Sequence, residues 1–214
     1  MCGRFTLHTP ILDLVERFSL HELKIDYAPS YNIAPTQQVL TVISNEETRT
    51  ALNMRWGLVP PWQKPGQSRP PLINARLETI AEKPTFRRLV NAKRCLILAD
   101  GFFEWKQEGS VKYPVYITVE QGQPFAFAGL WDNEPEPSCT IITQEAASSL
   151  QSIHHRMPLI LTPDSEKLWM SPIPFAQLRD SLPDQEKRVF NHYRVSTFVN
   201  SPRNNGPTCI VPSD

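Results

Sequence analysis

The chain has 214 residues, 40% of them hydrophobic, which is enough to bury a substantial core. Lysine and arginine number 22 and aspartate and glutamate number 22, which excludes attraction to a polyanion through total charge alone. No stretch approaches the ~18 continuous apolar residues of a membrane-spanning helix, and no secretory signal peptide is recognisable. We therefore expect a soluble, cytoplasmic protein with no membrane partner, whose residues 1–214 form a single domain.

The predicted elements are short, because 21 prolines against eight glycines divide the chain into many segments. Thr9 is a candidate helix cap, with Pro10 as the first helical residue. Hairpin turns are expected at 107–110 and 121–123. The pattern predicts an α+β fold dominated by antiparallel sheet. In chain order we expect a helix at 9–18, strands at 38–44 and 52–58, a helix at 83–90, strands at 94–99, 102–107, 113–120, 125–131 and 140–143, a helix at 144–153, a strand at 157–161 and a helix at 163–170.

The cysteines give little support for a disulfide framework or a metal centre. The four cysteines are widely separated and form no C-x-x-C pair, which fits neither dense disulfides nor a compact zinc site. Cys95 and Cys139 lie in apolar, strand-like runs and are expected to be small buried hydrophobes. No metal and no cofactor is predicted.

Cys2 belongs to the first of four polar clusters. Removal of Met1 would leave a free α-amine and a thiol on one residue. The pKa of an α-amine is ~7.7–8.0, and a thiol pKa of ~8.5 can be lowered by a cation such as Arg4. Such an aminothiol attacks an aldehyde first through nitrogen and then through sulfur, which closes a five-membered thiazolidine ring. The alternative is an ordinary cysteine at a mobile terminus.

The second cluster begins at Asn74. Asparagine offers a donor and an acceptor at once, and Arg76 can grip a phosphate or a carboxylate. The alternative is the start of a helix, capped by Asn74, with Arg76 paired to Glu78.

The last two clusters carry titratable groups. Glu104 lies among aromatic residues, where burial raises a carboxyl pKa and suits it to proton transfer near neutrality. The alternative is an outward-facing carboxylate paired with Lys106. His154 could act as a proton shuttle or as a surface group, and the spacing does not favour a metal ligand.

Eight motifs in register resemble the SOS-response-associated peptidase (SRAP) domain family, also called abasic-site processing proteins. Together they cover nearly the whole chain. The motifs are MCGRF at the start, YNIAPTQ from Tyr31, MRWGLVPPW from Met54, NARLET from Asn74, KRCLILADGFFEW from Lys93, CTIIT from Cys139, HHRMP from His154 and VNSPRNN from Val199. Three positions depart from the family pattern: Phe103, Gln144 and His155.

The resemblance implies a compact α+β domain around a mostly antiparallel, barrel-like sheet with short peripheral helices. A groove in this sheet would hold single-stranded DNA, and the processed Cys2 would bond to the ring-opened abasic sugar. By motif, Asn74 positions the cysteine or the sugar, Glu104 assists ring opening and proton transfer, and His154 assists imine formation and resolution. The residues expected to contact DNA backbone or bases are Arg4, Asn32, Trp56, Arg76, Trp105, Thr143 and Arg156.

The expected function is therefore covalent capture of abasic sites in single-stranded DNA, which shields the lesion in the DNA damage response. Such an enzyme could also catalyse a lyase side reaction, in which the captured sugar loses a phosphate. We expect a monomer that associates with the nucleoid when it is bound to DNA, with the replication machinery as a further partner. Two alternatives stay open: an N-terminal-cysteine peptidase that processes itself, and a non-covalent single-stranded DNA-binding protein.

Overall fold

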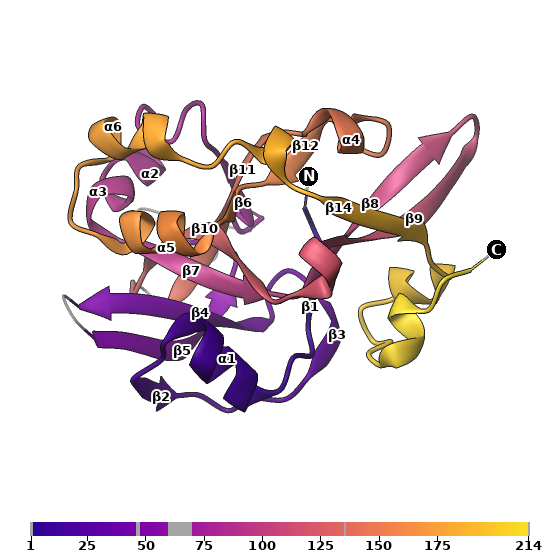
Figure 1. Cartoon of the computed structure of the whole chain (residues 1–214), viewed down its shortest axis with the longest axis horizontal. Coiled ribbons are helices and arrows are strands. Elements are labelled where there is room, and N and C mark those ends of the chain that lie inside the picture. The colour runs from indigo at the N-terminus through magenta and orange to yellow at the C-terminus, as the bar shows by residue number, and fades with distance from the viewer. Residues whose placement is uncertain (1, 46–47, 60–69, 135, 214) are drawn as a thin grey trace.

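Two sheets form the framework of the fold in the computed structural model, which describes residues 2–45, 48–59, 70–134 and 136–213 (Figure 1). The smaller sheet is antiparallel and has the strand order β14-β9-β8-β1-β3. Its strands are β1 (Phe5–Leu7), β3 (Ser30–Ile33), β8 (Gly101–Glu108), β9 (Val111–Val119) and β14 (Phe190–Arg194). Residues 60–62, the end of the motif that starts at Met54, lie outside the described residues.

The larger sheet has the order β12-β11-β10-β7-β4-β5-β2 in the described part of the chain, with β13 beside β10 and β6 beside β11. β11 also pairs with β5 at two positions, so the sheet curls back on itself without becoming a true barrel. The barrel-like expectation is corrected to that extent. The strands are β2 (Glu22–Lys24), β4 (Gln38–Asn45), β5 (Thr48–Trp56), β6 (Asn74–Arg76), β7 (Arg94–Ala99), β10 (Phe125–Asp132), β11 (Ser138–Glu145), β12 (Arg156–Pro158) and β13 (Ile160–Leu161).

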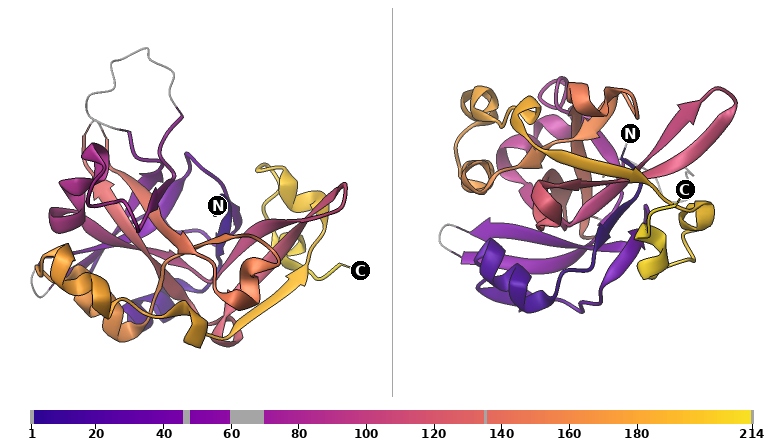
Figure 2. Two further views of the ribbon diagram at one scale, coloured as in Figure 1. Left: turned by 90° about the horizontal axis from the view of Figure 1, so that it is seen from above. Right: turned by 45° about the vertical axis from the view of Figure 1, so that its right-hand side comes forward.

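The helices are short and lie at the periphery, which confirms the predicted α+β class (Figures 1 and 2). In the part of the chain that the structure describes, no helix is long and apolar enough to cross a membrane. The α-helices are α1 (Ile11–Phe18), α2 (Pro84–Arg87), α3 (Leu89–Ala92), α4 (Ser148–Gln151), α5 (Pro163–Met170) and α6 (Phe175–Leu178). The 3₁₀ turns are η1 (Glu120–Gly122), η2 (Arg179–Ser181), η3 (Gln185–Lys187), η4 (Thr197–Asn200) and η5 (Pro207–Ile210).

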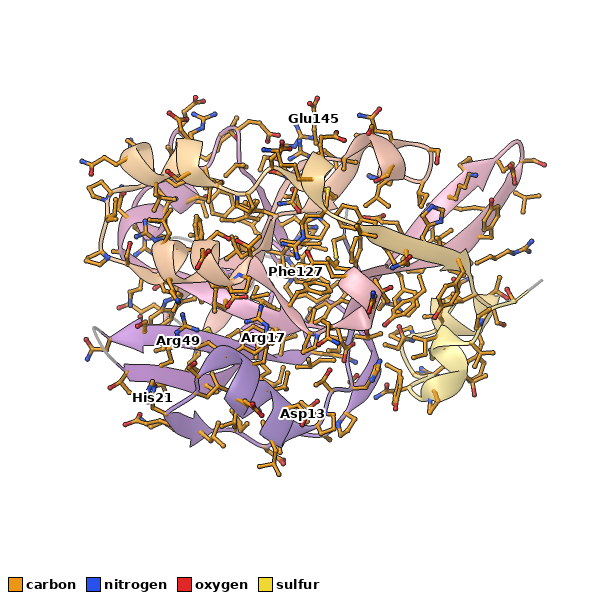
Figure 3. The ribbon with its side chains drawn as sticks, viewed as in Figure 1. Asp13, Arg17, His21, Arg49, Phe127 and Glu145 are labelled. Carbon is orange, nitrogen blue, oxygen red and sulfur yellow. The ribbon has the colours of Figure 1, made fainter. Side chains whose placement is uncertain are left out.

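Several predicted elements differ from the observed ones. The helix expected at 144–153 is wrong at its start, because β11 continues to Glu145 at the edge of the molecule (Figure 3). The strand expected at 157–161 is divided into β12 and β13, and the helix expected at 83–90 is divided into α2 and α3. Pro10 is the cap of α1, and the hydroxyl of Thr9 instead donates to the Asp100 carboxylate. The short strands β1, β2, β3, β6 and β14 were not predicted.

Phe127 of β10 lies in the middle of the main core (Figure 3). Phe5 of β1 packs edge-on against Phe127, with ring centroids 5.6 Å apart, and against Trp56 at 5.1 Å. Aromatic pairs in this geometry contribute beyond the area that they bury. The first strand is thus held inside the molecule by its side chains as well as by pairing with β3 and β8.

The five-stranded sheet separates this core from a smaller apolar cluster. Successive side chains of a strand point to opposite faces, so Phe102 faces the main core while Phe103 faces the smaller cluster. The carboxy-terminal segment, which contains η4 and η5, contributes Val199 and Cys209 to that cluster. This segment lies beside the β8–β9 hairpin (Figure 2). Cys95 and Cys139 are fully buried, as predicted.

Gly101→Ala should lower the free energy of unfolding by about 1–3 kcal/mol, because a Cβ there would overlap the ring and hydroxyl of Tyr116. Gly206→Ala is the matched control, since a Cβ at Gly206 meets nothing within 4 Å and the backbone is extended. Urea unfolding measures both. Equal stability of the two variants would contradict this account of the packing at the start of β8.

Candidate active site

The four residues assigned to chemistry meet at one place in the structure. Cys2 precedes β1, Asn74 begins β6, Glu104 lies on β8 and His154 precedes β12. Asn74 contacts Cys2 directly, Glu104 and His154 line one small pocket, and the charge of Glu104 acts on the Cys2 thiol. Segments separated by up to about 150 residues are therefore brought to one cluster.

Cys2 is fully buried. Burial, followed by the nearby charge of Glu104, raises the pKa of its thiol well above the usual range. The thiol makes a weak hydrogen bond to the Arg4 carbonyl oxygen, with an S to O distance of 3.9 Å. The expectation that the Arg4 guanidinium lowers this pKa is wrong, because that guanidinium donates to Asn32 and Val199 instead. The resting sulfur is a thiol.

Glu104 is a buried carboxyl group, 4% exposed, inside the strand β8. Burial raises its pKa to about 7, while the positive charges of the amino terminus and of Lys112 act in the opposite direction. At neutral pH the group therefore exists in both protonation states. A carboxyl with this pKa can donate a proton in one step and accept one in the next.

His154 shares the pocket with Glu104, and apolar side chains such as Phe102 and Leu150 complete its lining. Burial, with the amino-terminal charge second, lowers the pKa of the imidazole. Nδ1 accepts the Arg156 backbone N–H at 2.9 Å and lies 3.2 Å from the Arg156 carbonyl oxygen. The shorter contact favours the neutral ring with its proton on Nε2. The ring stacks on that of His155 with centroids 4.4 Å apart.

Asn74 is held by β6, which runs parallel to β11 with Asn74 opposite Ile141. Its side-chain Nδ2 donates to the Cys2 carbonyl oxygen at 2.9 Å. Among the described residues its buried Oδ1 has no hydrogen-bond partner, so a free acceptor lies on the residue that contacts Cys2. The alternative of a helix start capped by Asn74 is excluded by the strand.

Arg156 is buried, and its guanidinium donates hydrogen bonds to groups of the protein. It donates to both carboxylate oxygens of Glu78, at 2.6 and 3.0 Å, and to the Thr143 carbonyl oxygen at 2.7 Å. Thr143 itself is fully buried. The pair predicted between Arg76 and Glu78 is replaced by this longer-range one. Arg156 and Thr143 thus join β12 to β11 and to the segment after β6, which changes the expectation that they contact DNA.

Two further expected DNA contacts are also inside the protein. Trp56 is fully buried, and its indole Nε1 donates to the Ile73 carbonyl oxygen at 2.9 Å. Asn32 is 1% exposed. Both side chains are thus buried and bonded inside the protein in this structure, and a contact of either with DNA stays a prediction.

The remaining expected contacts reach the surface. Arg76 is exposed, and Trp105 is half-buried with its indole Nε1 bonded to Asn200 Oδ1 at 2.8 Å. The guanidinium of Arg4 lies 5.8 Å from the Trp105 ring centroid. Arg76 and Trp105 therefore offer a cation and an aromatic surface near the cluster.

Lys112 was not singled out by its sequence context. Its charge lowers the pKa of both Glu104 and His154, so it acts on the cluster from β9. The predicted hairpin could have identified Lys112, because pairing of β8 with β9 places Lys112 opposite Gln107, which lies three residues after Glu104. Among the described residues, no group of three His, Cys, Asp or Glu side chains could hold a metal ion.

Comparison with known proteins agrees with the motifs over nearly the whole chain. The family described as SOS response associated peptidase (SRAP) matches residues 1–202. The abasic site processing protein YoqW of Bacillus subtilis is 42% identical over 98% of this chain and 99% of its own. YedK of Escherichia coli, of the same description, is 33% identical over 99% and 100%. A crystal structure of a Bacteroides thetaiotaomicron protein superimposes with a TM-score of 0.82 at 26% identity, covering 99% of this chain and 100% of that one.

Arg156→Ala should lower the free energy of unfolding by about 1.5–3 kcal/mol, because it removes charged hydrogen bonds and leaves Thr143 O without that donor. Arg76→Ala, at an exposed position, should change stability by less than about 0.5 kcal/mol. Thermal and urea unfolding compare the two. A stable Arg156→Ala protein with weakened DNA binding would return Arg156 to the DNA-contacting residues.

Proposed function

Because the chain belongs to the SRAP family, we propose that it captures abasic sites in single-stranded DNA through a covalent bond from Cys2 after removal of Met1. The observation that carries this proposal is the placement of Cys2 beside a carboxyl group whose pKa is about 7. Its relatives in B. subtilis and E. coli carry the name abasic site processing protein. The adduct would shield the lesion in the DNA damage response.

The first step is formation of an imine. Protonated Glu104 donates to the ring oxygen of the sugar as the bond from that oxygen to the first carbon breaks. The hydroxyl on the first carbon loses its proton to solvent, which frees the aldehyde. The neutral α-amine of Cys2 attacks that carbon, and one water leaves. The reference pKa of an α-amine is ~7.7–8.0, and at that value part of the amine would be neutral at the pH where part of Glu104 is protonated.

The second step closes the thiazolidine ring. The Cys2 sulfur adds to the imine carbon and its proton passes to the imine nitrogen, so that no further atom leaves. Burial keeps the sulfur protonated until the imine exists, which favours attack by nitrogen first. The ring contains nitrogen, Cα, Cβ and sulfur of Cys2 together with the sugar carbon.

His154 and Asn74 would orient these steps. The Nε2–H of His154 can donate to the hydroxyl that leaves as water, since its lowered pKa keeps the ring neutral near pH 7. Asn74 already holds the Cys2 carbonyl oxygen, and its buried Oδ1 can accept from the amine or from a sugar hydroxyl.

Binding of the strand would depend on local groups, because the whole chain has no net charge. Arg76 is exposed and can meet a phosphate, and the half-buried Trp105 can stack on a base. Both act without a large basic surface. Single-stranded DNA with an abasic site is thus the proposed partner.

A peptidase is the second candidate, favoured by the description of the family. It would need Cys2 to attack an amide carbonyl as a thiolate. The raised pKa of the buried thiol opposes this, whereas it is compatible with addition to an imine. We therefore place aldehyde capture first and restrict peptide cleavage to self-processing.

Purified protein with a verified free amino-terminal cysteine should give a heat-stable shifted band with single-stranded DNA that contains one abasic site. Denaturing electrophoresis separates the product. Cys2→Ser is the matched control, because it keeps the amine but lacks the sulfur that forms the stable ring. Cys2→Ala should give no stable band either. A shifted band of equal stability from both variants would exclude the thiazolidine.

The rate of capture should follow a bell-shaped pH profile. It rises with pH as the amine loses its proton, and it falls as Glu104 loses its proton around its pKa of about 7. Glu104→Gln should be slower and should lack the descending limb, while Glu108→Gln, at the exposed end of β8, should keep it. Single-turnover rates between about pH 5.5 and 9 provide the measurement. A descending limb unchanged in Glu104→Gln would assign that titration to another group.

A further inference from the structure

Asn32 lies at the centre of a hydrogen-bond network that joins the amino-terminal segment to the carboxy-terminal one. Its side-chain Nδ2 lies within hydrogen-bond distance of three backbone carbonyl oxygens: Val199 at 3.1 Å, Ser201 at 3.0 Å and Asn204 at 2.6 Å. Two N–H groups are thus shared among three acceptors. Buried amides of this kind are costly unless they are paired, so this one fixes the path of the carboxy-terminal segment.

Arg4 enters the same network from β1's side. Its Nη1 donates to Asn32 Oδ1 at 2.6 Å and to the Val199 carbonyl oxygen at 2.8 Å. Its Nη2 lies 3.4 Å from the Asn200 carbonyl oxygen. Burial lowers the pKa of this guanidinium. The guanidinium is half-buried and donates to acceptors of the protein, although its sequence position suggested a contact to DNA.

The backbone of Arg4 connects this network to the candidate active site. The Arg4 carbonyl oxygen accepts the Phe103 N–H at 2.9 Å, and Phe103 directly precedes Glu104 on β8. Gly3, which offers no side chain to hold the chain in place, lies between Arg4 and Cys2. Chain ends fray unless they are tied down, so the anchor at Arg4 limits how far Cys2 can move from Glu104.

We infer that Asn32 is a positioning residue for Cys2, which acts through Arg4 and the carboxy-terminal segment 199–204 and does not contact DNA. The inference rests on the proposed function, because its effect is measured as capture of an aldehyde. It assigns a role in the reaction to a segment almost 200 residues from the nucleophile. Loss of the three bonds from Nδ2 would release that segment and loosen Arg4.

Asn32→Asp tests this inference, because a carboxylate still accepts from Arg4 but cannot donate to the three carbonyl oxygens. Asn191→Asp, an exposed position on β14, controls for the added charge. The measurements are the single-turnover rate of capture at saturating abasic-site DNA, the Kd for that DNA in a Cys2→Ala background, and the pH profile of the rate. All are made well below the thermal midpoint of each protein.

The expected result for Asn32→Asp is a rate about 10- to 100-fold slower, with an unchanged Kd and an unchanged pH midpoint, since only the geometry of the nucleophile is altered. A rate equal to that of Asn191→Asp, or a rise in Kd that accounts for the slower capture, would overturn the inference. No capture by the unaltered protein would instead overturn the proposed function.

Asn205→Ala keeps the test decisive if Asn32→Asp does not fold. Asn205 is exposed, and its Oδ1 accepts the Tyr31 N–H at 2.7 Å, which fastens the same segment to β3 from outside. We expect capture to slow several-fold with an unchanged Kd. Capture at the unaltered rate would contradict the inference, because loss of this outer bond would then leave the position of Cys2 unaffected.

Discussion

Burial of the first β-strand is the constraint on which the rest of the site depends. A chain end is ordinarily solvated and mobile, yet β1 lies between β3 and β8 with Phe5 packed against Phe127. This places Cys2 out of contact with water. The same exclusion of water raises the pKa of both Glu104 and the Cys2 thiol and lowers that of His154. Packing of one short strand therefore sets the protonation states of all the titratable groups around it.

The helices and strands with a strong hydrophobic pattern could be predicted from the sequence. The apolar run 94–99 and the segment 163–170 match β7 and α5, since each has a clear signal of its own. β1 and β6 have three residues each and were not predicted, because three residues show no period. Their existence depends on partners far along the chain, so the two strands that hold Cys2 and Asn74 were the least predictable ones.

The surroundings of the expected DNA contacts could not be predicted from the sequence for a related reason. A motif identifies a residue that matters to the family but does not say whether its side chain faces the solvent or the core. Arg156 meets Glu78, 78 residues away, and Arg4 meets Val199, 195 residues away. Only the folded chain shows that these cations are neutralised or bonded internally. Arg76 and Trp105 are expected DNA contacts that reach the surface, and two such local contacts suit a protein whose positive and negative charges balance.

A buried nucleophile also explains why two nucleophilic atoms are useful where one would not be. A thiol with a raised pKa is a poor nucleophile toward a carbonyl group. An exposed thiolate would instead react with other electrophiles. An amine needs no such activation, because an α-amine with its reference pKa of ~7.7–8.0 is partly neutral near pH 7. Once the amine has formed the imine, the sulfur is held next to the electrophilic carbon on the same residue, and proximity replaces acidity as the source of its reactivity. In the proposed reaction, burial thus lowers the general reactivity of the thiol and leaves it selective for an aldehyde that the amine has already bound.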